Sequence, residues 1–266
     1  MELIDIGCNL THDSFDEDRA EVLQRGVDAE VMQMIITGGT EAGSVAALEL
    51  ARRYPDQLFA TAGIHPHHAT DFTSSAESVL RELVGETEVV AAGETGLDYF
   101  RDFSPRPKQK SAFEYQLNIG IDAGLPMFLH QRDAHDDFLA LIREYRDRLP
   151  DLVVHCFTGS QTQLHEYLEL DCHIGLTGWI CDERRGTQIQ EFIKDIPLDR
   201  LMIETDSPYL KPRDLRPRVK THRNEPQWLP WIAKTISDCR PESLEEIAEN
   251  TTATARRFFR IQAAAD

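Results

Sequence analysis

The amino-acid sequence predicts an α/β fold, a single (β/α)8 TIM barrel followed by a C-terminal helical extension. Eight short apolar runs recur along the 266 residues. Their starts are roughly 20 to 37 residues apart, which is the length of a strand, a crossover helix and two loops. The runs are apolar throughout rather than alternating, as expected for a parallel sheet that is buried on both faces. They cover residues 3–8, 31–37, 58–63, 89–93, 126–130, 152–155, 173–177 and 201–205.

Helix-like segments lie between these runs. Residues 16–26 begin with acidic side chains and end at Gly26, which are common signals for the start and the end of a helix. Residues 41–54 are rich in alanine and leucine and stop before Pro55. Further helices are expected at 75–84, 108–123, 136–145, 162–170 and 187–194, and a longer helical tail at 228–260.

The whole chain, residues 1–266, is expected to form one domain. Barrels of this length commonly fold as a single domain. The sequence contains no linker rich in Pro, Gly or Ser, no low-complexity tract and no repeat. An open, doubly wound sheet is the alternative architecture, because it uses the same alternation of strands and helices.

Composition and charge argue against several classes of protein. The first residues lack the basic and apolar segments of a signal peptide, and no apolar run approaches the roughly 18 residues of a membrane span. We therefore expect a cytoplasmic protein. The five cysteines form no Cys-x-x-Cys pair, which argues against a disulfide framework and a structural zinc cage. The formal net charge of −18 should repel nucleic acids and anionic membranes at long range, unless basic residues are concentrated locally or a metal ion supplies the attraction.

Polar side chains gather where the predicted strands end, and in a barrel these ends form the active site. Asn9 and Thr11 follow the first strand, and the third is followed by Gly-Ile-His-Pro-His. The remaining strand ends carry Glu94, His130, His155 and Asp206. A lone histidine would be read as a structural or surface residue. Two histidines and two carboxylates at strand ends instead indicate a hydrolytic site for a divalent metal.

Several motifs contain these positions. They are Gly-Ile-His-Pro-His (63–67), Ala-Gly-Glu-Thr-Gly-Leu-Asp (92–98), Leu-His-Gln-Arg-Asp-Ala (129–134), His-Cys-Phe-Thr-Gly (155–159) and Ile-Glu-Thr-Asp-Ser-Pro-Tyr-Leu (203–210). In this order they resemble the signatures of TatD-family metal-dependent deoxyribonucleases, and Arg-Asn-Glu-Pro (223–226) also fits. Residues 178–186 resemble the TatD subgroup itself. The resemblance spans nearly the whole chain and implies an amidohydrolase-type barrel that hydrolyses phosphodiesters with a divalent metal.

The resemblance also implies a role for each site residue. Glu94 would bridge two metal positions, His130 and His155 would complete one of them, and Asp206 would serve the other. Asp206 could also orient or deprotonate the attacking water. His65 would contact the scissile phosphate or position the water on the metal, so that the catalytic residues would be Asp206, Glu94 and His65.

One departure from the family pattern concerns the second metal position. Many members carry a His-x-His pair after the first strand, where this chain has Asn9 and Thr11, as in the TatD subgroup. An amide oxygen and a hydroxyl are weaker ligands than two imidazoles. We therefore expect one firm site, formed by Glu94, His130 and His155, and a weak second site in which Asn9 and Thr11 are weak ligands or lie behind the ligands. Mg²⁺ is the expected metal, with Mn²⁺ or Zn²⁺ as alternatives.

Basic residues are concentrated in one predicted loop of this acidic chain. Residues 211–223 carry six basic side chains against one acidic side chain, and Arg184 and Arg185 follow the seventh strand. A basic rim around a metal centre could hold phosphates. The aromatic residues of the same loops could stack on unpaired bases or pack the barrel mouth; they are Tyr99, Phe100, Phe103, Trp179 and Tyr209. The substrate contacts expected are His65, His67, Arg132, Trp179, Arg184 and Arg223.

These observations favour a metal-dependent nuclease that acts on single-stranded DNA or RNA ends, and the subgroup resemblance implies 3′-to-5′ digestion. We expect a monomer with no membrane partner. One alternative is a metal-dependent hydrolase of carboxylic esters, lactones or amides, although a small neutral substrate would not need the basic loop. Another is a non-catalytic nucleic-acid-binding protein, which the retention of the predicted ligands disfavours.

Overall fold

The fold is the predicted α/β class, a (β/α)8 TIM barrel. The structure is a computed structural model and describes residues 1–263. Its strands follow one another around the sheet in chain order, from β1 to β8. They are β1 (Leu3–Cys8), β2 (Val31–Ile36), β3 (Leu58–Ala62), β4 (Val89–Asp98), β5 (Met127–Arg132), β6 (Leu152–Val154), β7 (Cys172–Leu176) and β8 (Leu201–Ile203). Every residue of β1, β4 and β7 is buried or nearly so, as a sheet covered on both faces requires.

The helices begin and end at residues that suit helix termini. Thr40 and Thr73 accept hydrogen bonds from backbone N–H groups in the first turns of α2 and α3, which satisfies donors that have no partner inside the helix. Gly124 has a φ of 64° and ends α4, a conformation that glycine adopts readily. The helices are α1 (Arg19–Asp28), α2 (Glu41–Ala51), α3 (Ser74–Leu83), α4 (Arg106–Ala123), α5 (His135–Tyr145), α6 (Gln161–Glu169), α7 (Thr187–Phe192), α8 (Leu229–Asp238) and α9 (Leu244–Phe259).

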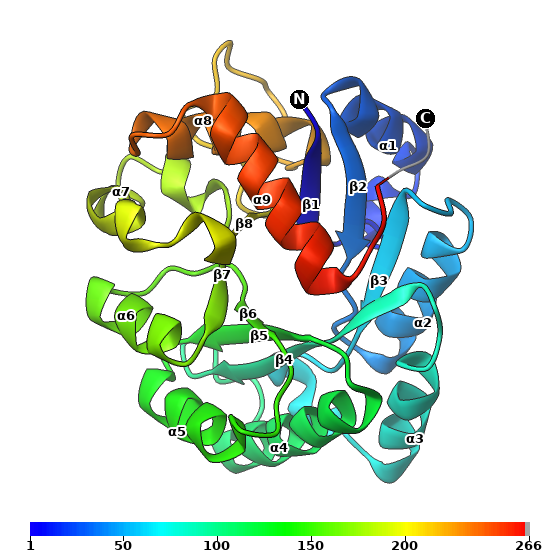
Figure 1. The fold of residues 1–266 in the computed structure, drawn as a ribbon. Helices are drawn as coiled ribbons and strands as arrows, with labels where there is room; N and C mark the ends of the chain where they lie inside the picture. The colour runs from blue at the N-terminus through cyan, green and yellow to red at the C-terminus, as the bar shows by residue number, and fades with distance from the viewer. Residues whose placement is uncertain (264–266) are drawn as a thin grey trace. The chain divides into compact units, whose positions relative to one another are not determined.

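Contacts divide the chain into two compact units. The first unit contains residues 1–36, 156–164 and the described residues from Ile174 onward. Within it, the ends of β8 and β1 are joined: the Asp206 N–H donates to the Gly7 carbonyl at 2.8 Å, and the Asn9 N–H donates to the Ser207 carbonyl at 2.7 Å. Helix α9 packs along β1 and β8 in the same unit, as Figure 1 shows.

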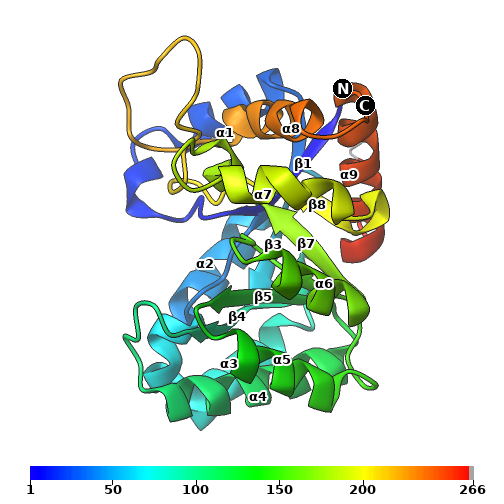
Figure 2. The same cartoon turned by 90° about the vertical axis from the view of Figure 1, so that its left-hand side faces the viewer.

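The second unit contains residues 37–155 and 165–173. Its strands β3 to β6 pair side by side. Helices α4 and α5 cover β4 and β5 (Figures 1 and 2). Phe113 of α4 and Phe138 of α5 are fully buried and stack with ring centroids 5.3 Å apart, so that the two helices share one apolar core.

The structure corrects the predicted ends of the fourth and fifth strands. The sequence predicted strands ending at residues 93 and 130, whereas β4 continues to Asp98 and β5 to Arg132. Pairing with the neighbouring strand sustains the extension, because Gly96 pairs with His130 and Asp98 pairs with Arg132. Glu94 and His130 therefore lie inside strands rather than at strand ends.

The predicted helical tail consists of two helices. Helix α8 ends at Asp238 and α9 begins at Leu244. Pro241 disfavours helical backbone at the residue before it. The Ser243 side chain accepts from the Glu246 N–H while the Glu246 side chain accepts from the Ser243 N–H, a reciprocal cap that starts a new helix. Within residues 1–263, none of the helices combines the length and the apolar character that crossing a membrane would need.

Candidate metal centre

Glu94 lies in β4 where the backbones of two strands approach each other closely. A Cβ added to Gly63, just after β3, would lie 2.5 Å from the Gly93 Cα. Gly93 has a φ of 133°, and a Cβ added there would collide with the Phe128 carbonyl oxygen. The Gly93–Glu94 peptide bond is cis, and the Glu94 N–H donates to the Gly38 carbonyl at 2.8 Å. Because Gly63 and Gly93 have no side chains, the strand backbones can approach closely enough to hold the Glu94 backbone in this position.

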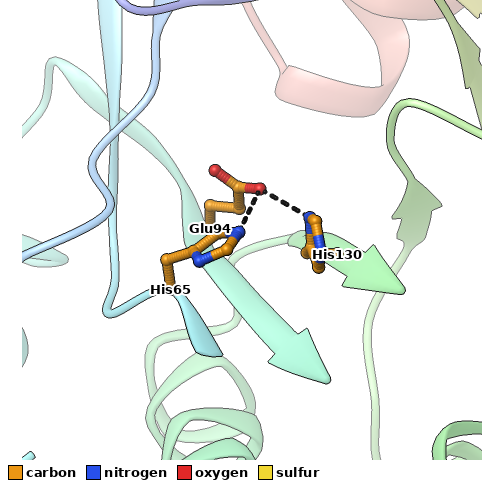
Figure 3. A group of neighbouring side chains, drawn as sticks. All are labelled: His65, Glu94 and His130. Atoms are coloured by element: carbon orange, nitrogen blue, oxygen red, sulfur yellow. Dashed lines mark hydrogen bonds and ion pairs between the residues drawn. The ribbon is translucent and has the colours of Figure 1, made fainter. Parts of the chain in front are cut away.

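Three histidines of the second unit surround one carboxylate oxygen of Glu94. The Glu94 Oε1 atom lies 2.7 Å from the His155 Nε2, 3.1 Å from the His130 Nδ1 and 3.4 Å from the His65 Nε2. Figure 3 shows His65 and His130 pointing toward this oxygen. Candidate ligand atoms of His65, Glu94 and His130 all lie within 4.8 Å of one another. Residues from three separate strand regions therefore meet at one buried carboxylate.

The hydrogen bond at the far side of the His65 ring decides which of its nitrogens carries a proton. The His65 Nδ1 accepts from the His67 N–H at 3.1 Å, so the Nδ1 has no proton and the neutral ring carries its proton on the Nε2. Burial lowers the pKa of His65 well below its usual value despite the neighbouring Glu94. His65 is therefore a neutral N–H donor toward the space beside Glu94.

His130 is held between two carboxylates. Its Nδ1 faces Glu94, and its Nε2 lies 3.1 Å from the Asp98 Oδ2. The same Asp98 oxygen lies 2.9 Å from the His67 Nε2. Burial would lower the pKa of His130, but its hydrogen bonds with Asp98 and Glu94 raise that pKa above the usual value. Histidines that ligate metals commonly place their second ring nitrogen against a carboxylate, as the His130 Nε2 does against Asp98.

The charge of Glu94 is stabilised although the residue is only 8% exposed. Burial alone would raise the pKa of its carboxyl group. The attraction of His155 and the hydrogen bonds from His130 and His155 outweigh burial, so the pKa of Glu94 lies well below its usual range. One carboxylate and two neighbouring imidazoles form a donor set that suits a divalent cation. In the described part of the chain, Glu94, His130 and His155 form such a set.

Asp98 is a site residue that sequence reasoning missed. It lies four residues after Glu94 on the same strand and is 3% exposed. Alternate residues of a strand point to the same face, so the even spacing of the two acids was a usable signal. It was not recognised because the strand was predicted to end before Glu94.

Asp206 and Asn9 meet in the first unit. Asp206 follows β8 and has a φ of 52°. The Asn9 side-chain N–H₂ donates to the Asp206 Oδ1 at 3.1 Å and to the Ser207 carbonyl at 3.2 Å. Because a carbonyl can only accept, the second bond fixes which end of the amide faces Asp206. Asn9 thus binds Asp206 as a donor, while Thr11 is half-buried in the turn after β1.

The segment that carries Asp206 is held by two buried side chains that the sequence did not single out. The Asp5 Oδ1 accepts from the Thr205 N–H at 2.9 Å, and the Asp5 Oδ2 accepts from the Thr205 hydroxyl at 2.5 Å. The Asn224 side chain donates to the Thr205 carbonyl at 2.8 Å, and its N–H donates to the Pro208 carbonyl at 2.9 Å. Both side chains are 0% exposed. The backbone around Asp206 is therefore fixed from both sides.

Most of the predicted substrate contacts lie in loops next to other charged or aromatic groups. The Arg132 guanidinium lies 5.0 Å from the Phe100 ring centroid. Arg184 binds Asp182, and the ring of Trp179 lies beneath Arg185. His67 lies beside Asp98, as described above. These positions do not test whether Arg132, Trp179 and Arg184 contact the substrate, so those contacts stay predictions.

Arg223 is more heavily engaged than the sequence suggested. Its guanidinium donates to Asp18 at 2.7 and 2.8 Å, to Glu225 at 2.8 Å and to the Ser14 carbonyl. Its carbon atom Cζ lies 4.9 Å from the Phe15 ring centroid. Arg223 thus anchors the end of the basic loop 211–223, and a contact with phosphate remains a prediction for it.

The loop aromatics divide into packed and exposed residues. The Tyr99 hydroxyl donates to Asp137 at 2.7 Å. By contrast, Phe100, Phe103 and Tyr209 are 57%, 68% and 52% exposed. Exposed aromatic rings are available to stack on bases, so the prediction of base stacking is retained for these three.

The fold and the site define a metal-binding hydrolase barrel, in which inward side chains of parallel strands form a carboxylate–imidazole group. The TatD related DNase family matches residues 4–260. The chain belongs to this family.

Relatives support the same assignment over almost the full chain. The "3′-5′ ssDNA/RNA exonuclease TatD" of Erwinia billingiae is 44% identical, over 98% of this chain and 100% of that protein. The protein of the same name from Cronobacter sakazakii is 46% identical, over 97% of each chain. The crystal structure of the TatD homologue YJJV from Escherichia coli has a TM-score of 0.89 at 27% identity, with 98% of each chain covered.

Proposed function

We propose that the protein is a metal-dependent exonuclease that hydrolyses single-stranded DNA or RNA from the 3′ end. The observation that carries the proposal is the meeting of His65, His130 and His155 at Glu94 in a chain of the TatD related DNase family. The names of the relatives supply the substrate and the direction of digestion. We include in the proposal a single barrel domain over residues 1–266, a monomer, and a cytoplasmic location.

Glu94, His130 and His155 are proposed to hold one divalent cation, Mg²⁺ or Mn²⁺ in preference to Zn²⁺. When bound, the cation supplies Lewis-acid polarisation of the phosphate and lowers the pKa of a water molecule. Glu94 contributes the negative charge, and Asp98 holds the His130 ring in place through its second nitrogen. A weak second metal position served by Asp206, which the family resemblance implied, remains part of the proposal.

His65 is proposed to act as a hydrogen-bond donor. Its Nε2–H, fixed by the bond from His67 to its Nδ1, would donate to a phosphate oxygen or to the attacking water. Asp206 enters the proposal through the motif 203–210 as the group that orients or deprotonates that water. Asn9 supports this role, because its donation to the Asp206 Oδ1 holds the carboxylate in place. Asn9 is thus proposed as a residue behind Asp206 rather than as a ligand.

The remaining predicted substrate contacts, His67, Arg132, Trp179, Arg184 and Arg223, are proposed to line the path of the strand. Their cationic and aromatic side chains suit a flexible polyanion with unpaired bases. They would not be required for a small carboxylic ester, lactone or amide.

The direct test is digestion of single-stranded oligonucleotides labelled at the 5′ or the 3′ end, with and without EDTA and with Mg²⁺, Mn²⁺ or Zn²⁺ restored. A 5′ label should yield a ladder of shortening products, and a 3′ label should leave first as a mononucleotide. Glu94→Gln should abolish digestion, whereas the exposed control Glu249→Gln should digest as the unaltered protein does.

Three results would count against the proposal. Digestion that is insensitive to both EDTA and added metal would rule out the metal-dependent mechanism. Full activity of Glu94→Gln would remove the residue on which the site is built. Binding of oligonucleotides without any turnover, or turnover of carboxylic esters alone, would favour one of the two alternative functions.

A further inference from the structure

Three arginines of the first unit converge on one buried carboxylate, Asp182. Arg184 donates to it twice, from its Nε at 3.1 Å and its Nη2 at 2.9 Å. Arg185 donates from its Nε at 3.0 Å, and the Arg213 Nε lies 3.6 Å away. We call Arg184, Arg185 and Arg213 the arginine cluster. The Asp182 side chain is only 3% exposed, so it lies beneath the cluster.

Tight backbone packing brings the cluster together. A Cβ added to Gly178 would collide with the Leu210 carbonyl oxygen, so the loop after β7 lies directly against the start of the basic loop 211–223. The Gly186 N–H donates to the Asp182 carbonyl at 2.7 Å, which closes the turn that carries Arg184 and Arg185. Two segments separated by about 30 residues are thus combined on one surface.

The cluster has more positive charge than its internal partners neutralise. Three guanidinium groups face Asp182, and the exposed Glu183 lies 3.4 Å from Arg213. The side chains of Arg184, Arg185 and Arg213 are 56%, 50% and 46% exposed. Their outer N–H groups therefore face solvent while their inner N–H groups bind Asp182. This local excess of positive charge, in a chain of net charge −18, offers N–H donors to an anion.

An aromatic ring fixes the orientation of one guanidinium. The Arg185 Cζ lies 4.0 Å from the centroid of the Trp179 ring, a distance at which the cation is attracted to the ring face. A guanidinium held by a ring on one side and a carboxylate on another loses little freedom when it binds an anion. Guanidinium groups bind phosphate oxygens through paired N–H donors.

We propose that the arginine cluster binds a phosphodiester group of the substrate strand beyond the bond being cleaved, and that Asp182 is the residue that positions it. The inference rests on the proposed function and deepens it by assigning a second contact with the strand. Because the cluster offers donors for phosphate oxygens, it would bind any base sequence and would matter only for strands long enough to reach it.

The first experiment compares Arg184→Gln, Arg185→Gln and Arg213→Gln on a series of single-stranded oligonucleotides that begins with a dinucleotide. For the unaltered protein, KM should fall as the strand lengthens to reach the cluster. Each substitution should raise KM for long strands about tenfold, the effect of losing one charge-assisted hydrogen bond, and should leave kcat unchanged. The slope of log KM against log salt concentration should fall by about 0.7 for each arginine removed.

A matched control is Arg148→Gln, which removes an exposed arginine from the second unit, where it binds Asn118. This variant has the same net charge as the cluster variants and should keep the KM and the salt slope of the unaltered protein. Equal KM values at every strand length in the cluster variants and in this control would overturn the proposal. So would equal increases in all four variants, because net charge alone would then explain the effect.

Asp182→Asn separates positioning from charge. Removing a carboxylate makes the surface more positive, so a purely electrostatic effect would tighten binding of long strands. If Asp182 positions the cluster, binding should weaken instead, and Arg184→Lys, which keeps charge but lacks the planar fork, should weaken it as well. Thermal unfolding would check that Asp182→Asn folds, and the arginine variants remain informative if it does not.

Failure of this proposal is distinguishable from failure of the proposed function. The dinucleotide tests the metal mechanism alone, because it is too short to reach the arginine cluster. If the Glu94→Gln variant cleaved the dinucleotide, the proposed function would fail. Strand binding by the arginine cluster can still be measured by fluorescence anisotropy in the Glu94→Gln background. If adding Arg184→Gln to that background leaves the anisotropy titration unchanged, the arginine cluster does not bind the strand. That result would not bear on the metal centre.

Discussion

Replacing Asp5 with asparagine should change how the stability of the protein depends on pH. Asp5 lies in β1 and is 0% exposed. Burial raises its pKa from 3.8 to about 7, although hydrogen bonds from Thr205 and Gly7 act in the opposite direction and Glu204 adds to the rise. The folded state therefore holds the Asp5 proton more tightly than the unfolded chain does.

The sign and the size of the effect follow from this shift. A raised carboxyl pKa gives a contribution to stability that is fully present below about pH 4 and is lost as the pH rises toward about 7. A shift of this size corresponds to about 4 kcal/mol in the free energy of unfolding. Roughly 2.5 kcal/mol of it should be lost between about pH 5 and about pH 8.

Urea unfolding at a series of pH values, with EDTA present, measures this loss. The free energy of unfolding of Asp5→Asn, minus that of the unaltered protein, should rise by roughly 2.5 kcal/mol across the same pH range. Asp147→Asn, which removes an exposed carboxylate, serves as the control for general charge effects. Parallel pH profiles for Asp5→Asn and the unaltered protein would refute the reasoning.

Two further substitutions, Gly93→Ala and Asp98→Asn, test the frame of the metal centre, with Gly124→Ala as the control for the first. Gly93→Ala should lower stability by several kcal/mol, because it combines a φ of 133° with a collision against the Phe128 carbonyl oxygen. Gly124→Ala, at a φ of 64° with no atom within 4 Å, should cost about 1 kcal/mol. Equal losses in thermal unfolding would contradict this account. Asp98→Asn should weaken Mn²⁺ binding about 10- to 100-fold in titration calorimetry, because Asp98 holds the His130 ring; unchanged affinity would show that it does not.

The sequence predicted the number and order of the strands because apolar runs and their spacing are local properties. Residues 3–8 were predicted as a strand with the bounds that the structure has. The extension of β4 was missed, because Glu94, Thr95 and Gly96 have the composition of a turn. Only pairing with β5 makes them a strand, and Gly96 follows this path at a φ of 147°. That pairing depends on residues more than thirty positions away.

Long-range contacts also determine which basic residues of the loop 211–223 face solvent. Its six basic residues suggested a free cationic surface, but Arg223 binds Asp18, more than 200 residues away along the chain. A charge count cannot distinguish an arginine that anchors a loop from one that faces solvent. The sequence indicated only part of the arginine cluster, the adjacent Arg184 and Arg185. Arg213 joins them through a contact between two loops, which the sequence does not show.

The roles of the three histidines depend on the far nitrogen of each ring, which no sequence motif reports. The His65 Nδ1 accepts a backbone N–H, so its Nε2 carries a proton and is a donor beside Glu94. The His130 Nε2 binds Asp98, so the Nδ1, which lies beside Glu94, is the nitrogen that would ligate a cation. Because its Nε2 carries a proton, His65 is not a metal ligand in its neutral form. The site therefore offers one carboxylate and two imidazoles rather than one carboxylate and three imidazoles. Fewer nitrogen ligands leave more positions for water and phosphate oxygens, which Mg²⁺ and Mn²⁺ prefer. The bond at the far side of His65 thus supports both the proposed metal and the proposed role of this residue in binding phosphate.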